Sequence, residues 1–220
     1  MSIYTPSSLF PGELLDTLIH KIEQCRVPGK RSVIGIVGAP GAGKSTLVEA
    51  LLGRLKVKTA VLPMDGFHLA NCQLERLGRA ERKGAPDTFD AEGYVALLAR
   101  LRPAYTRHCI YAPTFERRIE EPIAGAIAIE EDVELIITEG NYLLLDSPGW
   151  EGAAAQLDKC WYLEIDDTQR REQLIARHQH FGRSREEAIA WAEHTDEPNA
   201  RLIASCKARA DYIVCTTPNK

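Results

Sequence analysis

The sequence lacks an excess of basic residues, paired cysteines and long apolar runs. Its formal net charge is −4 over 220 residues, and nucleic-acid binding needs a basic field, so we expect no nucleic-acid partner. None of the six cysteines lies in a C-x-x-C pair, which argues against the common zinc spacings and favours reduced thiols. No apolar run approaches the roughly 18 residues of a membrane span, and the N-terminus has no signal-peptide pattern. We therefore expect a cytoplasmic protein that binds no membrane.

Short apolar runs alternate with amphipathic segments along most of the chain. Buried strands are predicted at 32–37, 59–64, 133–138, 159–165 and 211–214, and extended segments at 108–115 and 125–130. Helical spacing of apolar residues occurs at 12–25, 45–55, 90–101, 168–179, 184–194 and 198–210. The alternation predicts an α/β fold, with a mainly parallel sheet and helices on both faces. Residues 1–220 suffice for a single domain with a small lid, in which residues 1–30 hold an N-terminal helix.

Residues 38–46, GAPGAGKST, match the phosphate-loop pattern G-x-x-x-x-G-K-[ST] between a predicted strand and a predicted helix. Its glycines let backbone N–H groups turn inward toward an anion, and the following helix adds its positive end. Lys44 is expected to reach the β- and γ-phosphates, and the Ser45 hydroxyl to ligate Mg²⁺. The motif predicts a bound nucleoside triphosphate, and a chance glycine-rich turn is the alternative. The predicted nucleotide-binding residues of the loop are Gly38, Ala39, Pro40, Gly41, Ala42, Gly43, Lys44, Ser45 and Thr46.

Three classes of protein use such a loop: molecular switches, motors or transporters, and kinases. The one Asn-Lys pair stands at 219–220, so the guanine-reading N-K-x-D motif is missing, and no LSGGQ-like transporter signature occurs. A motor ATPase typically ends its second acidic strand in Asp-Asp or Asp-Glu, whereas here Glu139-Gly140 follows the apolar run. These observations favour a kinase.

Two carboxylates end predicted strands at the edge where the ligands of such sheets gather. Glu139 can hold Mg²⁺ directly or through water, and the alternative for it is a helix cap or a turn residue. Asp65, which ends the run VLPMD, can accept the proton of a hydroxyl that attacks the γ-phosphate. The alternative for Asp65 is a helix N-cap. The polar, glycine-punctuated stretch after Asp65 is a candidate wall for a second substrate.

Five stretches in order resemble a known family: the phosphate loop, MDGFH, RKGAPDTFD, YAPTFERRIEEP and IITEGNYLLLD. They resemble the P-loop kinases related to uridine kinase, phosphoribulokinase and bacterial pantothenate kinase. Within this group the chain looks most similar to bacterial nucleoside/nucleotide kinase-like, or fructose-transport-system kinase-like, proteins. The resemblance implies a P-loop NTPase fold and a kinase that uses Mg-ATP to phosphorylate a hydroxyl of a small molecule. A dimer is common among these relatives, so a homodimer is a candidate assembly.

The resemblance assigns roles to residues on both sides of the predicted site. Lys44, Asp65 and Glu139 are implied as catalytic groups, with Asp65 as the base and with Glu139 and Ser45 at the metal. The acceptor-binding region is expected at about 66–130. The residues implied as acceptor contacts are Asp65, His68, Lys83, Tyr111 and Arg117.

The lid is expected at about 168–195, and its phosphate-binding arginines among Arg170, Arg177 and Arg183. Arg177 is implied as the catalytic lid arginine, and Arg183 as a contact to ATP. Solvated surface charge is the alternative for these arginines, as a satisfied core or surface histidine is for His68. The stretch TDEPNARLI, at 195–203, also resembles the closest group, and a helix-start cap explains it sufficiently.

The acceptor region departs from the well-known relatives, because Asp65-Gly66-Phe67-His68 stands where uridine kinases typically have D-S-F-Y. The acceptor therefore stays open among a nucleoside, a sugar and a pantothenate-like alcohol. The rival hypothesis is a nucleotide-binding regulatory protein or slow ATPase without a small-molecule acceptor. The phosphate loop alone would suit that protein equally well.

Overall fold

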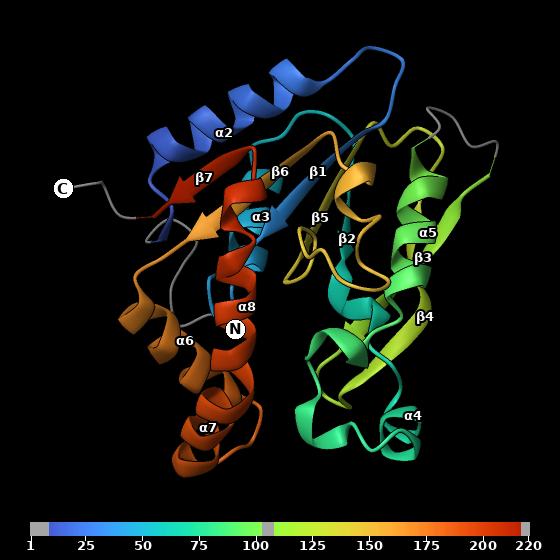
Figure 1. Ribbon diagram of the computed structural model, residues 1–220. Coiled ribbons are helices and arrows are strands. Elements are labelled where there is room, and N and C mark those ends of the chain that lie inside the picture. The colour runs from blue at the N-terminus through green and yellow to red at the C-terminus, as the bar shows by residue number, and fades with distance from the viewer. Residues whose placement is uncertain (1–8, 103–107, 217–220) are drawn as a thin grey trace.

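A parallel sheet of five strands lies at the centre of the computed structural model, which describes residues 9–102 and 108–216. Each predicted parallel strand is present. β5 ends two residues later than predicted, because Pro63 of β2 still pairs with Glu139. Glu139 therefore lies within the strand. The strands are β1 (Ser32–Val37), β2 (Thr59–Pro63), β5 (Leu135–Gly140), β6 (Lys159–Glu164) and β7 (Tyr212–Cys215), in the order β2-β5-β1-β6-β7 (Figure 1).

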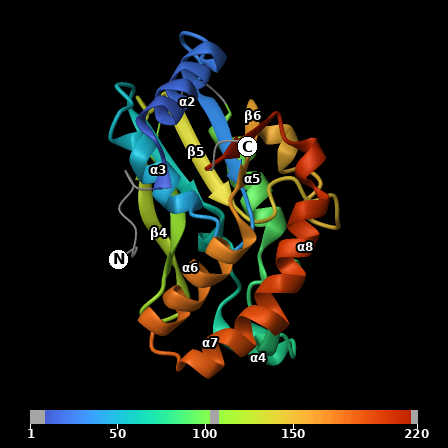
Figure 2. The same ribbon diagram turned by 90° about the vertical axis from the view of Figure 1, so that its left-hand side faces the viewer.

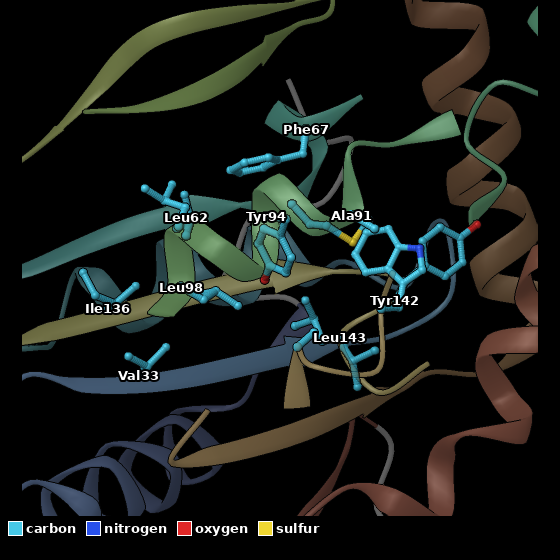
Figure 3. Packing of buried hydrophobic residues seen from close by; sticks show 14 of the residues in the cluster. Val33, Leu62, Phe67, Ala91, Tyr94, Leu98, Ile136, Tyr142 and Leu143 are labelled. Atoms are coloured by element: carbon cyan, nitrogen blue, oxygen red, sulfur yellow. The ribbon is translucent and has the colours of Figure 1, made fainter. Parts of the chain in front are cut away.

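Helices cover both faces of the sheet, as the alternation predicted. Successive residues of β1 point to opposite faces, so Ile34 packs with α2 and α3, and Val33 with α5. Figure 3 shows Tyr94 and Leu98 of α5 on the same side of the sheet as Val33. The helices named here are α2 (Gly12–Cys25), α3 (Lys44–Leu52) and α5 (Ala91–Leu101). α5 begins with an N-cap, where Asp90 accepts a hydrogen bond from the backbone N–H of Gly93.

The chain between β2 and β5 forms a second group of elements beside the edge strand β2. The extended segments predicted at 108–115 and 125–130 pair antiparallel with each other, outside the main sheet. Short helical turns fill the segment between β2 and α5. These elements are η1 (Met64–Phe67), α4 (Asn71–Arg76), η2 (Ala80–Arg82), η3 (Pro86–Thr88), β3 (Ile110–Glu116) and β4 (Glu121–Ile129).

A third group of helices follows β6 and contains the predicted lid segment. The predicted boundary near Asp196 is wrong, because α7, a π-helical turn and α8 continue without a break, and Pro198 fits the first turn of α8. The last helix is also shorter than predicted and ends in a 3₁₀ turn. The elements are α6 (Asp167–His180), α7 (Arg185–Trp191), η5 (Ala192–Asp196), α8 (Glu197–Ser205) and η6 (Lys207–Arg209). Figure 2 shows α6, α7 and α8 gathered at one end of the molecule.

Two further features complete the fold. A capping box starts α7, since Ser184 and Glu187 each bond the backbone of the other. A short 3₁₀ turn, η4 (Ala154–Gln156), precedes β6. Within the residues described, no helix is both long enough and apolar enough to cross a membrane.

Candidate active site

A cavity of about 1100 Å³ lies at the carboxyl ends of the parallel strands. The phosphate loop and the end of β5 line its inner end, with Lys44 and Glu139. One side wall comes from η1, α4 and β3, and the other from α6, η5 and α8. These two walls are the groups that stand apart in the lower half of Figure 1. Ligands of open parallel sheets bind at this edge.

The phosphate loop has the backbone that the glycine pattern predicted. Gly41 and Gly43 have φ values of 81° and 87°, which favour glycine. A Cβ on Gly41 would also lie 2.6 Å from the carbonyl oxygen of Arg170, so α6 packs directly on the loop. Of the nine predicted residues, Gly38, Ala39 and Ala42 are not among those that line the cavity, and the other six are.

The Lys44 side chain lies against the loop and donates hydrogen bonds to protein acceptors there. Its Nζ donates to the carbonyl oxygens of Gly38 at 2.9 Å and Ala39 at 3.3 Å, and to Asn141 Oδ1 at 2.8 Å. Burial lowers the pKa of Lys44, and the carboxylates of Glu139 and Asp65 oppose that shift. The ammonium group therefore lies where phosphate oxygens can replace protein acceptors.

Ser45 and Glu139 supply a pair of oxygen ligands beside the loop. Ser45 Oγ donates to Glu139 Oε1 at 2.9 Å. Burial raises the pKa of Glu139, whereas Lys44 lowers it. Glu139 therefore caps no helix; it faces Ser45 from within β5. The described residues hold no cluster of three or more His, Cys, Asp or Glu suited to a metal, and a Mg²⁺ ion bound with nucleotide typically takes only one or two protein ligands.

One buried donor near the phosphate loop has no partner among the described residues. Gln173 of α6 lines the cavity, and its Nε2 is sealed from solvent without a hydrogen bond. A buried unpaired amide costs free energy, and an oxygen-rich ligand would satisfy it. The donors and oxygen ligands here thus fit a nucleotide with Mg²⁺.

Asp65 lies in η1, directly after β2, and its side chain is 30% exposed toward the cavity. Arg117 Nη2 donates to Asp65 Oδ2 at 2.8 Å. Burial alone would raise the pKa of Asp65, but the interaction with His68 in its protonated form, together with the charges of Arg117 and Lys44, outweighs burial and lowers that pKa. The N-cap alternative is wrong, because Pro63 occupies the cap position of η1 and the Asp65 side chain caps no helix.

A glycine keeps Asp65 close to Glu139. A Cβ on Gly140 would lie 2.4 Å from the Cβ of Met64, the residue before Asp65. The glycine of the Glu-Gly pair therefore lets η1 pack against the end of β5. The two carboxylates consequently share one end of the cavity.

Gly140→Ala should lower the free energy of unfolding by about 1–3 kcal/mol, as overpacking of a core does. For a chain of this size, each kcal/mol lowers Tm by roughly 2–4 °C. Thermal unfolding measures the effect, and Gly53→Ala is the control, since its Cβ would meet nothing closer than 3.7 Å. Equal Tm values for the two variants would contradict the packing role of Gly140.

His68 and Lys83, which the resemblance implied as acceptor contacts, both line the cavity. The His68 ring stacks between Phe89, at 4.0 Å, and Phe115, at 4.6 Å between centroids. Burial lowers the pKa of His68, so the ring is neutral at pH 7. Lys83 Nζ donates to Asn71 Oδ1 at 2.6 Å, so α4 is tied to the loop that follows it.

Tyr111 is the one implied acceptor contact that lies elsewhere. Its side chain is on β3 but is 63% exposed, and it is not among the residues that line the cavity. Arg117, six residues later and directly after β3, reaches Asp65.

The three candidate lid arginines have different surroundings. Arg170 is 4% exposed and pairs with Asp167 and Glu197, so it joins α6 to α8. The Arg183 guanidinium lies over the Trp191 ring, 3.8 Å from its centroid, and both residues line the cavity. Arg177 also lines the cavity, and no hydrogen bond or ion pair reaches its guanidinium among the described residues.

Sequence reasoning missed Asn141, Gln173 and Trp191, which line the cavity as well. A signal for two of them existed. Asn141 directly follows the Glu-Gly pair, and Gln173 is one helical turn before Arg177 on the same face of α6. Asp196 and Asn199, which sequence reasoning treated as cap residues, also line the cavity.

Comparison with known proteins identifies the group to which this fold and this loop belong. A family model described as "Methylmalonyl Co-A mutase-associated GTPase MeaB" matches residues 13–66, a part that holds the phosphate loop. The chain is 32% identical over 212 residues to C227.14 of Schizosaccharomyces pombe, named as a candidate uridine kinase, covering 90% of this chain and 89% of that relative.

Two solved structures have the same fold over nearly the whole chain. A candidate fructose transport system kinase from Silicibacter sp. TM1040 has a TM-score of 0.81 and 36% identity, covering 90% of this chain and 98% of that chain. YFH7 from Saccharomyces cerevisiae has a TM-score of 0.76 at 18% identity, covering 94% and 99% of the two chains. The chain belongs to the P-loop kinases of the group that includes uridine kinase and pantothenate kinase.

Proposed function

We propose that the protein is an ATP-dependent kinase that transfers the γ-phosphate to a hydroxyl of a small molecule. The observation that carries the proposal is the position of Asp65. Its carboxylate shares one cavity with the phosphate loop, Glu139 and Arg177, where it could take the proton of an acceptor hydroxyl.

The transfer step assigns each of these groups a task. Asp65 takes the proton of the acceptor hydroxyl while the acceptor oxygen forms a bond to the γ-phosphorus. The bond from that phosphorus to the β–γ bridging oxygen breaks, and ADP leaves with the electron pair. Lys44 and Arg177 stabilise the charge that spreads over the phosphoryl oxygens. Ser45 and Glu139 would hold Mg²⁺, which when bound neutralises the β- and γ-phosphate oxygens.

Water must be kept from the γ-phosphate for transfer to exceed hydrolysis. α6 and α7, with the cavity-lining Phe181, Arg183 and Trp191, stand over the side of the cavity away from the acceptor wall. This segment is the one that we propose as the lid. The acceptor would then be a nucleoside, a sugar or a pantothenate-like alcohol, as the related kinases suggest.

The direct test measures ADP formation from Mg-ATP in the presence of nucleosides, sugars and pantothenate. We expect one class of compound to raise the rate well above the basal hydrolysis, with a phosphorylated acceptor detected by mass spectrometry. Slow hydrolysis that no compound stimulates, together with tight ATP binding, would instead support the regulatory protein or slow ATPase.

A further inference from the structure

The turn that joins β3 to β4 brings Arg117 to the proposed base. Residues 117–120 form this turn, directly after Glu116 ends β3. Arg117 Nη2 donates to Asp65 Oδ2, whereas Asp65 Oδ1 has no partner among the described residues. Arg117 therefore fixes the orientation of the carboxylate and leaves one oxygen available to an acceptor hydroxyl.

Few bonds within the hairpin itself fix this turn. Its strands pair only with each other, outside the main sheet. Within the turn, Ile119 N–H donates to the Glu116 carbonyl oxygen at 3.3 Å, and Arg118 N–H to the Glu116 side chain at 3.0 Å. Glu120 has a φ of 53°, the one positive value at a non-glycine residue in the described part of the chain. That conformation costs such a residue free energy, so contacts from outside the hairpin are needed to keep it.

Lys83 and Asn71 supply those contacts. Lys83 Nζ donates to the Glu120 carbonyl oxygen, and Asn71 Nδ2 donates to the same oxygen at 3.2 Å. The backbone N–H of Asn71 donates to both carboxylate oxygens of Glu121, each at 3.1 Å. Lys83 Nζ also donates to Asn71 Oδ1 at 2.6 Å, so the two side chains form one network. We call Lys83, Asn71 and the Glu120 carbonyl group the turn anchor.

The Lys83 side chain is bonded mainly within the protein. A lysine has three N–H donors, and the turn anchor uses two of them. Burial lowers the pKa of Lys83, and the carboxylates of Glu120 and Glu121 oppose that shift. Its Nζ also lies 5.1 Å from the ring centroid of Phe115, two residues before Arg117. Lys83 therefore contacts both the end of β3 and the turn that carries Arg117.

We propose that Lys83 and Asn71 are positioning residues, which hold the β3–β4 turn so that Arg117 keeps Asp65 oriented for proton transfer. This inference rests on the proposed kinase function. It replaces the direct acceptor contact that the resemblance implied for Lys83. Although Lys83 lines the cavity, it acts on the reaction through Glu120 and Arg117.

A double-mutant cycle between Lys83 and Arg117 tests this pathway. Lys83→Met keeps a side chain of similar length and removes both donated bonds. It should lower kcat/KM for the best acceptor about tenfold, the effect of a lost hydrogen bond to a charged group. Arg117→Met should lower kcat/KM at least as far. In a chain that already carries Arg117→Met, adding Lys83→Met should cause no further loss, because the group through which Lys83 acts is gone. A residue that contacts the acceptor directly would lower kcat/KM by the same factor in either background.

The pH–rate profile supplies a readout that a general loss of stability would not move. Burial raises the pKa of Asp65, but the positive groups around it, Arg117 among them, hold that pKa below its ordinary value. Displacing Arg117 weakens one of these interactions and so raises the pKa of Asp65. The acid limb of the kcat profile should therefore lie at higher pH in Lys83→Met than in the wild type. The charged and titratable groups that face Asp65 are His68 after η1, Arg117 after β3, Lys44 on α3, Arg177 on α6 and Glu139 on β5.

A matched control and a measurement without turnover separate positioning from folding. Lys58→Met removes a lysine that is 50% exposed, pairs with Asp132 and is not among the residues that line the cavity. It should leave kcat/KM and the pH profile unchanged. Hydrogen exchange of peptides that span residues 116–122, followed by mass spectrometry, reports the order of the turn directly. Exchange should be faster in Lys83→Met than in Lys58→Met. If thermal unfolding shows that Lys83→Met is not folded, Asn71→Ala takes its place in the cycle.

The outcomes distinguish this inference from the function on which it rests. Losses of kcat/KM that multiply when Lys83→Met and Arg117→Met are combined overturn the positioning role and return Lys83 to direct acceptor contact, while the kinase stands. Equal exchange of the turn in Lys83→Met and Lys58→Met also overturns it. Absence of any stimulated ADP formation by the wild type overturns the kinase, and the positioning role with it, whereas hydrogen exchange still decides whether the turn anchor orders the turn.

Discussion

Asp65→Asn should lower kcat by about 10²–10⁴, the contribution of a general base, while nucleotide binding is retained. Asparagine has nearly the same shape as aspartate, and its carbonyl oxygen can still accept the hydrogen bond that Arg117 donates at 2.8 Å. The change therefore removes the proton acceptor and leaves the geometry of η1 largely intact. Steady-state ADP formation with saturating acceptor measures kcat, and calorimetry measures the Kd for ATP.

The matched control is Asp146→Asn, which removes a carboxylate that is 73% exposed and only 3.8 Å from Arg209. Such surface pairs contribute about 0–1 kcal/mol, so this variant should keep the wild-type kcat and Kd. A kcat for Asp65→Asn within a few-fold of the control would rule out Asp65 as the base. A Kd for ATP that rises in parallel with the loss of kcat would indicate that the carboxylate holds the metal or the phosphates instead.

The lowered pKa of Asp65 also bears on the acid side of the pH–rate profile. A carboxylate with a depressed pKa stays ionised as the pH falls from neutral, until the pH approaches that depressed value. Any loss of rate in the weakly acidic range must therefore come from another group. The same ionisation makes Asp65 a weaker proton acceptor, so positioning of the hydroxyl carries much of its effect.

How much of the site could be predicted depends on how local its contacts are. The phosphate loop could be predicted residue by residue, because its glycines, Lys44 and Ser45 all lie within nine consecutive residues. Glu139 could be placed at the sheet edge from one apolar run. Arg117 could not be derived in this way, since its partner Asp65 is 52 residues away in the sequence.

The lid arginines show more clearly that contacts between residues far apart in the sequence could not be predicted. Arg170, Arg177 and Arg183 look alike in sequence, and no periodicity separates them. In the structure their contacts differ. Arg170 binds Glu197, which is 27 residues away in the sequence, and Arg183 lies over the Trp191 ring. Glu197 itself reaches α6 because the helix continues through Pro198, where sequence reasoning had expected a boundary.

The strands of the parallel sheet could be predicted, because each contains a short apolar run, whereas their order in the sheet could not. The hairpin of β3 and β4 could not be assigned to a sheet, because its strands are partly exposed and pair only with each other. The π-helical turn at 192–196 had no sequence signal that we can name. It precedes the buried Glu197 and Asn199, and such turns are frequent at functional sites.

Arg177→Met should lower kcat by about 10³ or more, the lower end of the effect of an arginine that stabilises phosphoryl transfer. The guanidinium stands in the cavity among Asp65, Glu139 and Asp196 without bonding any of them, and burial together with Arg117 lowers its pKa. An arginine nonetheless stays charged at pH 7. A partly buried charge without a partner lowers the stability of the fold, so methionine should leave Tm unchanged or raise it. Arg171→Met is the control on the same helix, because Arg171 is 51% exposed and is not among the residues that line the cavity; it should keep kcat. Loss of kcat with an equal or higher Tm would mark Arg177 as a group kept for the transition state, whereas a lower Tm with an unchanged kcat would make it a structural residue of α6.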